Sequence, residues 1–332
     1  MQATLFPQAN AGKTVPMSRA VRFEKYGDVD VLRVEDVEPP QPAADQILVE
    51  VVAAGINPGE ISVRTGAYHE RWPATFPSGQ GSDFAGRVVE VGQSVTEFAV
   101  GDDVVGWSDW RSAQAEYVVV PADHLIRKPL ALDWIRAGGL FVAGVTAYVS
   151  VRAVQPKEGE TVVVSGAAGG VGVTAVQLAR NAGAKVIGIA SENNAAWLRS
   201  VGVTPVAYGD GLEDRIREIA PDGVDAFVDA YGKGYVDLAL SLGVDKARIN
   251  TIADFAAAQK YGVKTDGSAV GSDNEILAIV ANEIAWGRVS MPIAAVYPLE
   301  SVQEAYTELA QRHTRGKIVL SMELAPDAGR LS

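Results

Sequence analysis

The chain has 332 residues and a formal net charge of −12, and 48% of its residues are hydrophobic and 21% charged. This composition is typical of a globular protein, and the length is sufficient for two domains. No cluster of basic residues is present, which argues against nucleic acid and anionic membranes as partners. Because the chain contains no cysteine, disulfides, thiolate nucleophiles and thiolate zinc ligands are excluded together.

The first residues, "MQATLFPQANAGKTVP", lack the basic region and the long apolar core of a secretory signal. We interpret residues 1–17 as an N-terminal extension, with Met17 as an alternative native start. No run of about 18 apolar residues is present to span a bilayer. Together with the absence of cysteine, these features lead us to expect a cytoplasmic protein with no membrane partner.

The sequence pattern changes near Leu130. From Ser18 to about Pro129, runs such as "ILVEVVAAGI" and "AEYVVVP" predict strands, and the Gly- and Pro-rich stretch "NPGEISVRTGAYHERWPATFPSGQGSDFAG" predicts a loop. Beyond Leu130, "ALDWIRAGGLFVAGVTAYVSVRAV" predicts a helix, and apolar strands then alternate with helical segments. This alternation predicts βαβ units and a parallel sheet. The tail "YPLESVQEAYTELAQRHTRGKIVLSMEL" predicts a helix followed by a strand.

A glycine-rich stretch joins a strand predicted at Thr161–Val164 to a helix predicted at Val171–Arg180. Between them, Ala167, Gly169 and Gly172 occupy the three positions of the dinucleotide-binding fingerprint, with alanine at the first. At the second position, glycine lets the backbone approach a pyrophosphate, and at the third it lets the helix lie close to the strand. The helix N-terminus then attracts the phosphates. A structural turn also uses glycine, but here strand, loop and helix follow in the order that a dinucleotide site requires.

The end of the next predicted strand, "KVIGIAS", bears on the choice between NADPH and NADH. NAD sites usually have a carboxylate here, which accepts a hydrogen bond from the ribose 2′-hydroxyl, whereas this chain has Ala190 and Ser191. A carboxylate would repel a 2′-phosphate, and these small residues leave room for one. We therefore favour NADPH. Glu192 lies one residue further along and keeps NADH open as the alternative.

Five motifs occur in the order and spacing of one family: "VVAAGINPGE", "PSGQGSDFAGRVVEVG", "GDDVVG", "AAGGVG" and "GKIVL". From Ser18 to Met322 the chain resembles the zinc-independent quinone oxidoreductases, the zeta-crystallin-like branch of the medium-chain dehydrogenase/reductase superfamily. The resemblance implies an α/β protein with a β-rich GroES-like catalytic domain in two pieces, 18–140 and 290–332. It also implies a Rossmann domain, a doubly wound parallel sheet that binds NADP(H), at 141–289.

The resemblance further implies which residues meet the substrate and the cofactor. Asn57 and Tyr68 match catalytic positions: Asn57 is expected near the nicotinamide ribose and Tyr68 facing the substrate. The positions expected to contact the cofactor are Asn57, Thr146, Gly169, Gly170, Val171, Ser191, Asn194, Tyr208 and Lys317. Ser191 and Asn194 match the positions at the 2′-phosphate, although the family often has lysine in place of Asn194.

The resemblance implies that no metal is bound. Zinc-dependent relatives have a cysteine ligand where this chain has Asn57, and a histidine ligand where it has Ser82. The three histidines of the chain are isolated in sequence, which is typical of surface residues: His69, His124 and His313.

Several of these residues have a structural interpretation as well as a functional one. Asn57 precedes Pro58 and is a good turn residue by propensity alone, and Tyr68 is equally explained by packing. We interpret Asp83 as a loop-stabilising hydrogen-bond acceptor in preference to a catalytic base. Three tryptophans either stack on a flat substrate or belong to the core: Trp72, Trp107 and Trp110.

We expect an NADPH-dependent reductase that transfers hydride directly to quinones or α,β-unsaturated carbonyls. Conjugation in these acceptors spreads the developing negative charge, so hydrogen bonds can take the place of a zinc ion. The alternative enzyme is an enoyl-thioester reductase. The alternative of another class is a non-catalytic NADPH-binding protein with a structural or redox-sensing role. From the family resemblance we also expect a homodimer, with "KARINTIAD" near a paired sheet edge.

Overall fold

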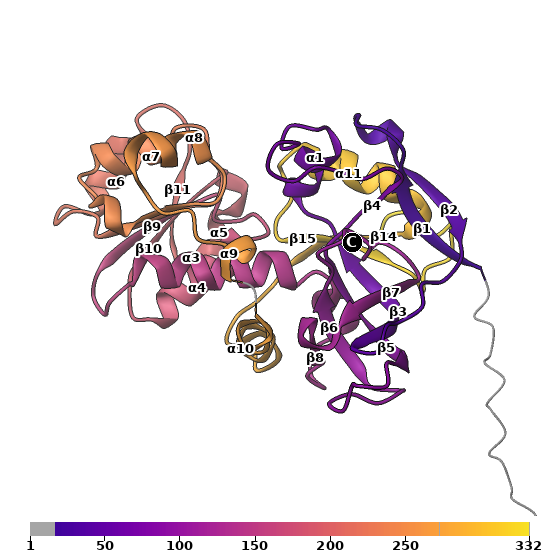
Figure 1. The fold of residues 1–332 in the computed structure, drawn as a ribbon. Coiled ribbons are helices and arrows are strands. Elements are labelled where there is room, and N and C mark those ends of the chain that lie inside the picture. The colour runs from indigo at the N-terminus through magenta and orange to yellow at the C-terminus, as the bar shows by residue number, and fades with distance from the viewer. Residues whose placement is uncertain (1–16, 272, 332) are drawn as a thin grey trace, which may run out of the picture.

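The computed structural model describes residues 17–271 and 273–331, which form two lobes (Figure 1). The expected N-terminal extension lies outside the described residues except for Met17. A parallel sheet with its helices makes up one lobe, and a β-rich lobe carrying α1 and α11 makes up the other. Within the described part of the chain, no helix is both long and apolar enough to cross a membrane.

The β-rich lobe contains two sheets. One has the strand order β2-β1-β4, and the other has the order β14-β15-β3-β5-β6-β8, with β7 also paired to β3. The strands are β1 (Ser18–Phe23), β2 (Arg33–Val37), β3 (Gln46–Gly55), β4 (Ser78–Gly79), β5 (Asp83–Val91), β6 (Asp103–Trp107), β7 (Tyr117–Pro121), β8 (Leu125–Arg127), β14 (Ile293–Pro298) and β15 (Lys317–Ser321). Strand β15 runs antiparallel to β3, with Leu320 opposite Ala54. The last two strands of the chain, β14 and β15, therefore belong to the same sheet as β3, β5, β6 and β8 from its N-terminal part.

Three helices accompany these sheets: α1 (Pro58–Arg64), α2 (Trp134–Gly138) and α11 (Val302–Ala310). Helix α1 lies in the stretch that the sequence predicted as a loop, so that prediction was wrong there. The helix begins because Asn57 is its N-cap and Pro58 fits its first turn. The carboxylate of Glu60 accepts a hydrogen bond from the backbone N–H of Asn57 at 2.8 Å, as the third residue of a helix often does for its cap.

The second lobe is built on a parallel sheet with the order β11-β10-β9-β12-β13. Its strands are β9 (Thr161–Ser165), β10 (Lys185–Ala190), β11 (Thr204–Ala207), β12 (Ala226–Asp229) and β13 (Ile249–Thr251). Its helices are α3 (Thr146–Val154), α4 (Gly172–Asn181), α5 (Ala195–Ser200), α6 (Leu212–Ile219), α7 (Tyr235–Ser241), α8 (Phe255–Tyr261), α9 (Ser268–Gly271) and α10 (Asn274–Ala285). Because the strand order reverses between β9 and β12, the carboxyl ends of these two strands form the switch point where such sheets bind ligands.

The single helix predicted after Leu130 is divided in the structure. Helix α2 ends at Gly138, a π-helical segment spans Phe141–Val145, and α3 begins at Thr146. Such π-helical turns are rare and occur frequently at functional sites. The segment lies where the chain passes from the β-rich lobe to the parallel sheet.

The outer side of β13 is covered. Residues 263–265 lie along it, with a bridge between Asn250 and Lys264, and the N–H of Thr251 donates to the carbonyl of Lys264. The segment "KARINTIAD", expected near a dimer edge, contains this outer strand. Its role in a dimer stays a prediction.

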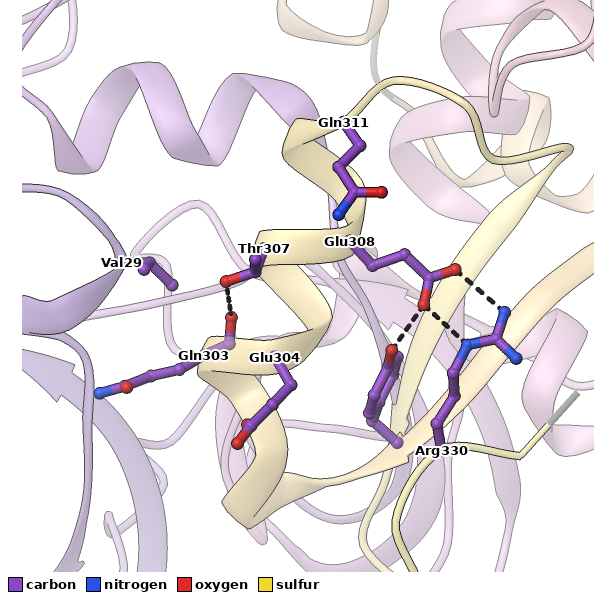
Figure 2. A pocket seen from close by; sticks show the side chains of 8 residues that line it. Val29, Gln303, Glu304, Thr307, Glu308, Gln311 and Arg330 are labelled. Atoms are coloured by element: carbon purple, nitrogen blue, oxygen red, sulfur yellow. Dashed lines mark hydrogen bonds and ion pairs between the residues drawn. The ribbon is translucent and has the colours of Figure 1, made fainter.

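A cavity of about 600 Å³ opens beside α11 and is bordered by the C-terminal tail (Figure 2). Glu308 accepts hydrogen bonds from the hydroxyl of Tyr297 at 2.5 Å and from Nε of Arg330 at 2.7 Å. The backbones of Leu331 and Val296 exchange hydrogen bonds in both directions. The tail is therefore fixed along the edge strand β14 by the ion pair of Arg330 with Glu308, by the hydrogen bond from Nη2 of Arg330 to the carbonyl of Ala294 at 3.1 Å and by the backbone bridge.

We expect Glu308→Gln to release this tail at neutral pH, measured as faster hydrogen exchange of the Leu331 amide. The hydrogen bond from Arg330 lowers the pKa of Glu308 in the folded protein. The stabilisation that the ionised Glu308 gives the folded protein is therefore present above its unfolded pKa of about 4.3. This stabilisation is lost as the pH falls through the lower pKa of Glu308 in the folded protein. Glu304→Gln, on the same helix, is the matched control and should change nothing. Unchanged exchange in Glu308→Gln would contradict the account.

Candidate active site

A buried lysine connects the C-terminal strand to the loop before α1. Nζ of Lys317, the first residue of β15, donates to Oδ1 of Asn57 at 2.5 Å and to the carbonyl of Ile56 at 2.9 Å. It also lies 3.4 Å from Oδ2 of Asp83. Lys317 is 3% exposed and Asp83 is 0% exposed. The three N–H groups of the ammonium thus each have an acceptor.

The side-chain amide of Asn57 lies between two carboxylates. Its Nδ2 is 3.2 Å from Oε1 of Glu60 and 3.1 Å from Oδ2 of Asp83. Asp83 also accepts the backbone N–H of Val142, from the π-helical segment, at 2.9 Å. With Oδ1 accepting from Lys317, the amide has one fixed orientation. The structure thus brings Asn57, Asp83 and Lys317 together, and it shows Asp83 as a hydrogen-bond acceptor.

A second layer of buried polar side chains supports Glu60. The hydroxyl of Tyr306 donates to Oε2 of Glu60 at 2.5 Å and accepts from the amides of Gln80 at 3.0 Å and Gln114 at 2.7 Å. Burial raises the pKa of Glu60, and the nearby charge of Asp83 raises it further. Burial, together with Glu60, also raises the pKa of Tyr306 well above its ordinary value. Tyr306 therefore stays a hydrogen-bond donor at neutral pH.

The glycine-rich loop lies against this cluster. A Cβ placed on Gly170 would be 3.2 Å from Cδ of Lys317, and the N–H of Gly316 donates to the carbonyl of Ala168 at 2.9 Å. A Cβ on Gly169 would meet only the carbonyl oxygen of Gly166, at 3.3 Å, whereas one on Gly172 would lie 2.0 Å from the same oxygen. Glycine at 172 is therefore required for packing, and glycine at 169 leaves space above the loop. These residues fit the phosphates of a dinucleotide.

Asp229 connects the carboxyl ends of three strands beneath the glycine-rich loop. It accepts hydrogen bonds from Ser165 of β9 at 2.5 Å, from Thr251 of β13 at 2.7 Å and from the N–H of Gly232 at 2.9 Å. Asp229 is fully buried. These bonds hold the switch point rigid and give this carboxylate a structural role.

The residues expected at the adenosine end lie on neighbouring strand ends. Ala190 pairs with Ala207, so Ser191 and Tyr208 follow side by side. Nδ2 of Asn194 donates to Oγ of Ser191 at 2.9 Å, and Tyr208 is 53% exposed.

A cation that the sequence did not reveal lies at the end of the neighbouring strand. Nη2 of Arg215, from α6, donates to the carbonyl of Ala207 at 2.8 Å. The sequence pattern showed no cation in the turn after β10, because this arginine comes from a helix beyond the next strand.

Thr146 and Tyr68 lie at the junction of the lobes. Oγ1 of Thr146, at the start of α3, accepts from the N–H of Ser268 at 3.2 Å. The ring of Tyr68 is 5.4 Å from that of Trp72 and 6.1 Å from that of Phe255, at the start of α8. Tyr68 thus contacts the parallel-sheet lobe, and among the described residues no hydrogen bond or ring contact joins it to Asn57 or Lys317. The expected catalytic role of Tyr68 stays a prediction.

The other aromatic and histidine candidates lie either in the core or in exposed loops. Trp107 is stacked between His124 at 4.3 Å and Phe141 at 4.5 Å and is 4% exposed, so it belongs to the core. Trp110 is 63% exposed. Nδ1 of His69 lies 2.8 Å from a backbone carbonyl in its own loop, and His313 is exposed. Within residues 17–271 and 273–331, no group of three or more acidic or histidine side chains is arranged to hold a metal ion.

Comparison with known proteins agrees with this architecture. The alcohol dehydrogenase GroES-like domain family matches residues 43–130, and the zinc-binding dehydrogenase family matches residues 201–320. The quinone oxidoreductase of Pseudomonas aeruginosa is 30% identical over 328 residues, which cover 92% of this chain and 99% of that protein. The chain belongs to the quinone oxidoreductase family. The recognition from sequence motifs is thereby confirmed.

Two further relatives bear on fold and cofactor. The Escherichia coli quinone oxidoreductase, solved in complex with NADPH, superimposes with a TM-score of 0.81 at 27% identity and covers 91% of this chain and 99% of its own. This likeness confirms the predicted combination of a GroES-like domain and a Rossmann domain. The NADPH-dependent alkenal/one oxidoreductase of Arabidopsis thaliana is 29% identical to this chain over 311 residues. These residues cover 90% of this chain and 78% of the Arabidopsis protein.

Proposed function

We propose that the chain is an NADPH-dependent reductase of quinones or α,β-unsaturated carbonyls that transfers hydride directly to the conjugated acceptor. The observation that carries the proposal is the contact of the glycine-rich loop with the buried cluster, where Gly170 lies against Lys317. This contact puts the candidate phosphate site next to the polar groups of the other lobe. The bound cofactor supplies the hydride. The names of the bacterial and plant relatives support the choice of NADPH and of conjugated acceptors.

The residues of the chain have distinct roles in this proposal. Gly169, Gly170 and Val171 face the pyrophosphate, and Thr146 and Asn57 lie toward the nicotinamide. Lys317, Glu60 and Asp83 fix the Asn57 amide, so it needs no reorientation when the cofactor binds. A preorganised hydrogen-bonding group of this kind is more effective than one that must be ordered during the reaction.

We propose that the enzyme works without zinc. Asn57 and Ser82 stand where zinc-dependent relatives have metal ligands, and the ammonium of Lys317 lies 2.5 Å from the amide oxygen of Asn57. A positive charge at this point repels a divalent cation. Elemental analysis should find no stoichiometric zinc. Stoichiometric zinc, or activity lost to a chelator and restored by zinc, would contradict this part of the proposal.

The proposal favours NADPH over NADH. Ser191, Asn194 and Tyr208 line the adenosine end, and Arg215 adds positive charge at the end of β11. Fluorescence titration of both cofactors should give tighter binding of NADPH. Equal affinity, or tighter NADH, would assign Glu192 to the ribose and overturn this preference.

We expect Tyr68→Phe to lower kcat on enones by about a hundredfold while the affinity for NADPH stays nearly unchanged. Hydride that arrives at a conjugated carbon drives charge onto the carbonyl oxygen, where a fixed hydroxyl donor is most effective. Quinones are more electrophilic and should lose less. Trp72→Phe, on the same loop, controls for altered packing. If Tyr68→Phe reduces neither activity, Tyr68 serves only to pack against Trp72 and Phe255.

We further propose domain limits of 18–140 with 290–332 and of 141–289, because β14 and β15 pair into the N-terminal sheet and the π-helical segment begins at Phe141. We also propose a homodimer, supported by the family resemblance. Light scattering at working concentration tests the dimer, and a monomeric mass would contradict it.

The acceptor class is tested by initial rates of NADPH oxidation with a quinone, an enone, an enal and an enoyl-CoA in parallel. Turnover of the first three with little turnover of enoyl-CoA supports the proposal. Preferential turnover of enoyl-CoA would make the chain an enoyl-thioester reductase instead. Tight NADPH binding without turnover of any acceptor would favour the non-catalytic role.

A further inference from the structure

The carboxyl group of Glu60 is surrounded by hydrogen-bond donors, and the residue is 7% exposed. Its Oε2 accepts from the N–H of Asn57 at 2.8 Å and from the hydroxyl of Tyr306 at 2.5 Å. Its Oε1 accepts from the N–H of Ser82 and from Nδ2 of Asn57, both at 3.2 Å. Within the described residues, every hydrogen bond of this carboxyl group is one that it accepts. A protonated carboxylic acid has a hydrogen to donate, so the surroundings of Glu60 fit the ionised form.

The hydroxyl of Tyr306 cannot turn away from Glu60. Its oxygen accepts from the side-chain amides of Gln80 at 3.0 Å and Gln114 at 2.7 Å. A hydroxyl has one hydrogen and two lone pairs, and the two amides occupy both lone pairs. The hydrogen is therefore left for Glu60, and a proton on the Glu60 carboxyl would face it. Tyr306 thus opposes protonation of Glu60.

A buried cation, Arg64, lies over the ring of the same tyrosine. Arg64 is 1% exposed, and its guanidinium carbon is 4.9 Å from the centroid of the Tyr306 ring. Nε and Nη1 of Arg64 have no hydrogen-bond partner among the described residues. Nη2 lies 4.0 Å from Asp28, whose side chain is 85% exposed. An exposed carboxylate at that distance compensates a buried charge only weakly.

Tyr306 connects this cation to the buried carboxylate. Glu60 and Arg64 lie four residues apart on α1, a spacing that puts both side chains on one side of the helix. Tyr306, from α11, donates its hydroxyl hydrogen to Glu60 and has the guanidinium of Arg64 over its ring. The negative face of an aromatic ring attracts a cation. The phenol therefore has a favourable contact with each member of the pair.

The charges around Glu60 balance when its carboxyl group is ionised. The titratable groups that face it are Asp83 of β5, Lys317 of β15, Tyr306 of α11 and Arg64 of its own helix. Ionised Glu60 and Asp83 then match the positive charges of Lys317 and Arg64. Burial and, after it, the charge of Asp83 raise the pKa of Glu60, whereas the hydrogen bond from Tyr306 lowers it. Tyr306 therefore acts against the effects that would protonate Glu60.

We propose that Tyr306 is a positioning residue: with Arg64 over its ring, it keeps Glu60 ionised inside the protein, and the ionised Glu60 holds the Asn57 amide in its single orientation. Protonation of Glu60 would weaken one of the two carboxylate acceptors of Nδ2 of Asn57. The proposal deepens the proposed function, and its kinetic consequence rests on that function, because Asn57 is expected near the nicotinamide.

Infrared spectroscopy of the cofactor-free protein tests the ionisation of Glu60 without any turnover. Each spectrum is compared with that of the same protein carrying Glu60→Gln as well, so that the difference reports the Glu60 carboxyl group. The wild type should show no carbonyl band of a protonated carboxylic acid at neutral pH. Tyr306→Phe, which removes only the hydroxyl, should show such a band, and the band should disappear as the pH is raised.

A second variant and a matched control accompany Tyr306→Phe. Arg64→Met removes the buried cation and keeps a side chain that packs well on an aromatic ring, so it should give the same band. Tyr297→Phe is the control, because the hydroxyl of Tyr297 also donates to a carboxylate, Oε2 of Glu308, at 2.5 Å. Glu308 keeps its ion pair with Arg330. The control should therefore show no acid band at neutral pH, judged against its own Glu308→Gln partner, and an unchanged kcat.

In turnover, Tyr306→Phe should make kcat on an enone depend on pH. Loss of the hydroxyl raises the pKa of Glu60, and each pH unit below that pKa lowers the ionised fraction about tenfold. The ratio of the variant's kcat to that of the wild type should therefore fall on acidification, by up to about tenfold per pH unit. At alkaline pH, where Glu60 is ionised again, the two rates should converge. A variant that had lost only packing would be slower by the same factor at every pH.

Two results would overturn the proposal. One is an acid band from Glu60 in the wild type at neutral pH, or its absence from both Tyr306→Phe and Arg64→Met. The other is a loss of kcat in Tyr306→Phe that is the same at every pH. If the wild type turns over no acceptor, the proposed function fails, and the infrared spectra still decide whether Tyr306 keeps Glu60 ionised.

Discussion

Replacing Lys317 with methionine is expected to lower the free energy of unfolding by about 3–5 kcal/mol, because removing one partner of a buried ion pair leaves the other uncompensated. Asp83 is fully buried and would lose the ammonium that lies 3.4 Å from its Oδ2. Asn57 would also lose the donor to its Oδ1. The midpoint and the slope of a urea unfolding curve give the change in the free energy of unfolding.

Two further variants separate charge from packing. Lys317→Met combined with Asp83→Asn should lose less stability than Lys317→Met alone, since the uncompensated charge is then absent. Arg217→Met breaks the exposed pair with Glu213 and should cost at most about 1 kcal/mol. If Lys317→Met costs no more than Arg217→Met, the buried pair does not stabilise the junction of sheet and loop.

Gly169→Asp is expected to abolish the binding of both NADPH and NADH, with affinity falling at least about a hundredfold, while the protein stays folded. A Cβ at Gly169 meets only one backbone oxygen, at 3.3 Å, so the loop can keep its shape. The added carboxylate would occupy the space for the pyrophosphate and repel it. Fluorescence titration and the thermal midpoint measure the two effects separately.

Gly172→Asp is the matched comparison, because its Cβ would lie 2.0 Å from the carbonyl oxygen of Gly166. We expect this variant to lose both folding and binding. Retained cofactor affinity in folded Gly169→Asp would show that the glycine-rich loop is only a structural turn.

The parts of the molecule that depend on local patterns were predictable from sequence. Strand β9, the glycine-rich loop and α4 follow from an apolar run, three fingerprint positions and a helical period that lie close together in the chain. Helix α1 was missed although "NPGE" carries an asparagine cap, a proline at the first helical position and a glutamate three residues after the cap. The surrounding glycines and prolines obscured that signal.

The parts that depend on contacts between distant segments were not predictable. Lys317 meets Asn57 across 260 residues, and Tyr306 meets Glu60 across 246. No spacing rule connects such pairs. Lys317 reaches Asn57 because β15 pairs with β3, and Tyr306 reaches Glu60 because α11 lies against α1. Arg312 and Tyr231 likewise come from different lobes, and their side chains are in contact. The sequence pattern does not reveal this contact, because it depends on how the two lobes pack.

Direct hydride transfer is tested most directly with NADPH that carries deuterium at both positions of nicotinamide C4. Reduction of an enone with this cofactor, followed by mass spectrometry and NMR of the product, locates the label. Direct hydride transfer should leave one deuterium on the β-carbon of the saturated ketone for each cofactor oxidised. A product without deuterium at that carbon, or cofactor oxidation without reduction of the enone, would contradict it.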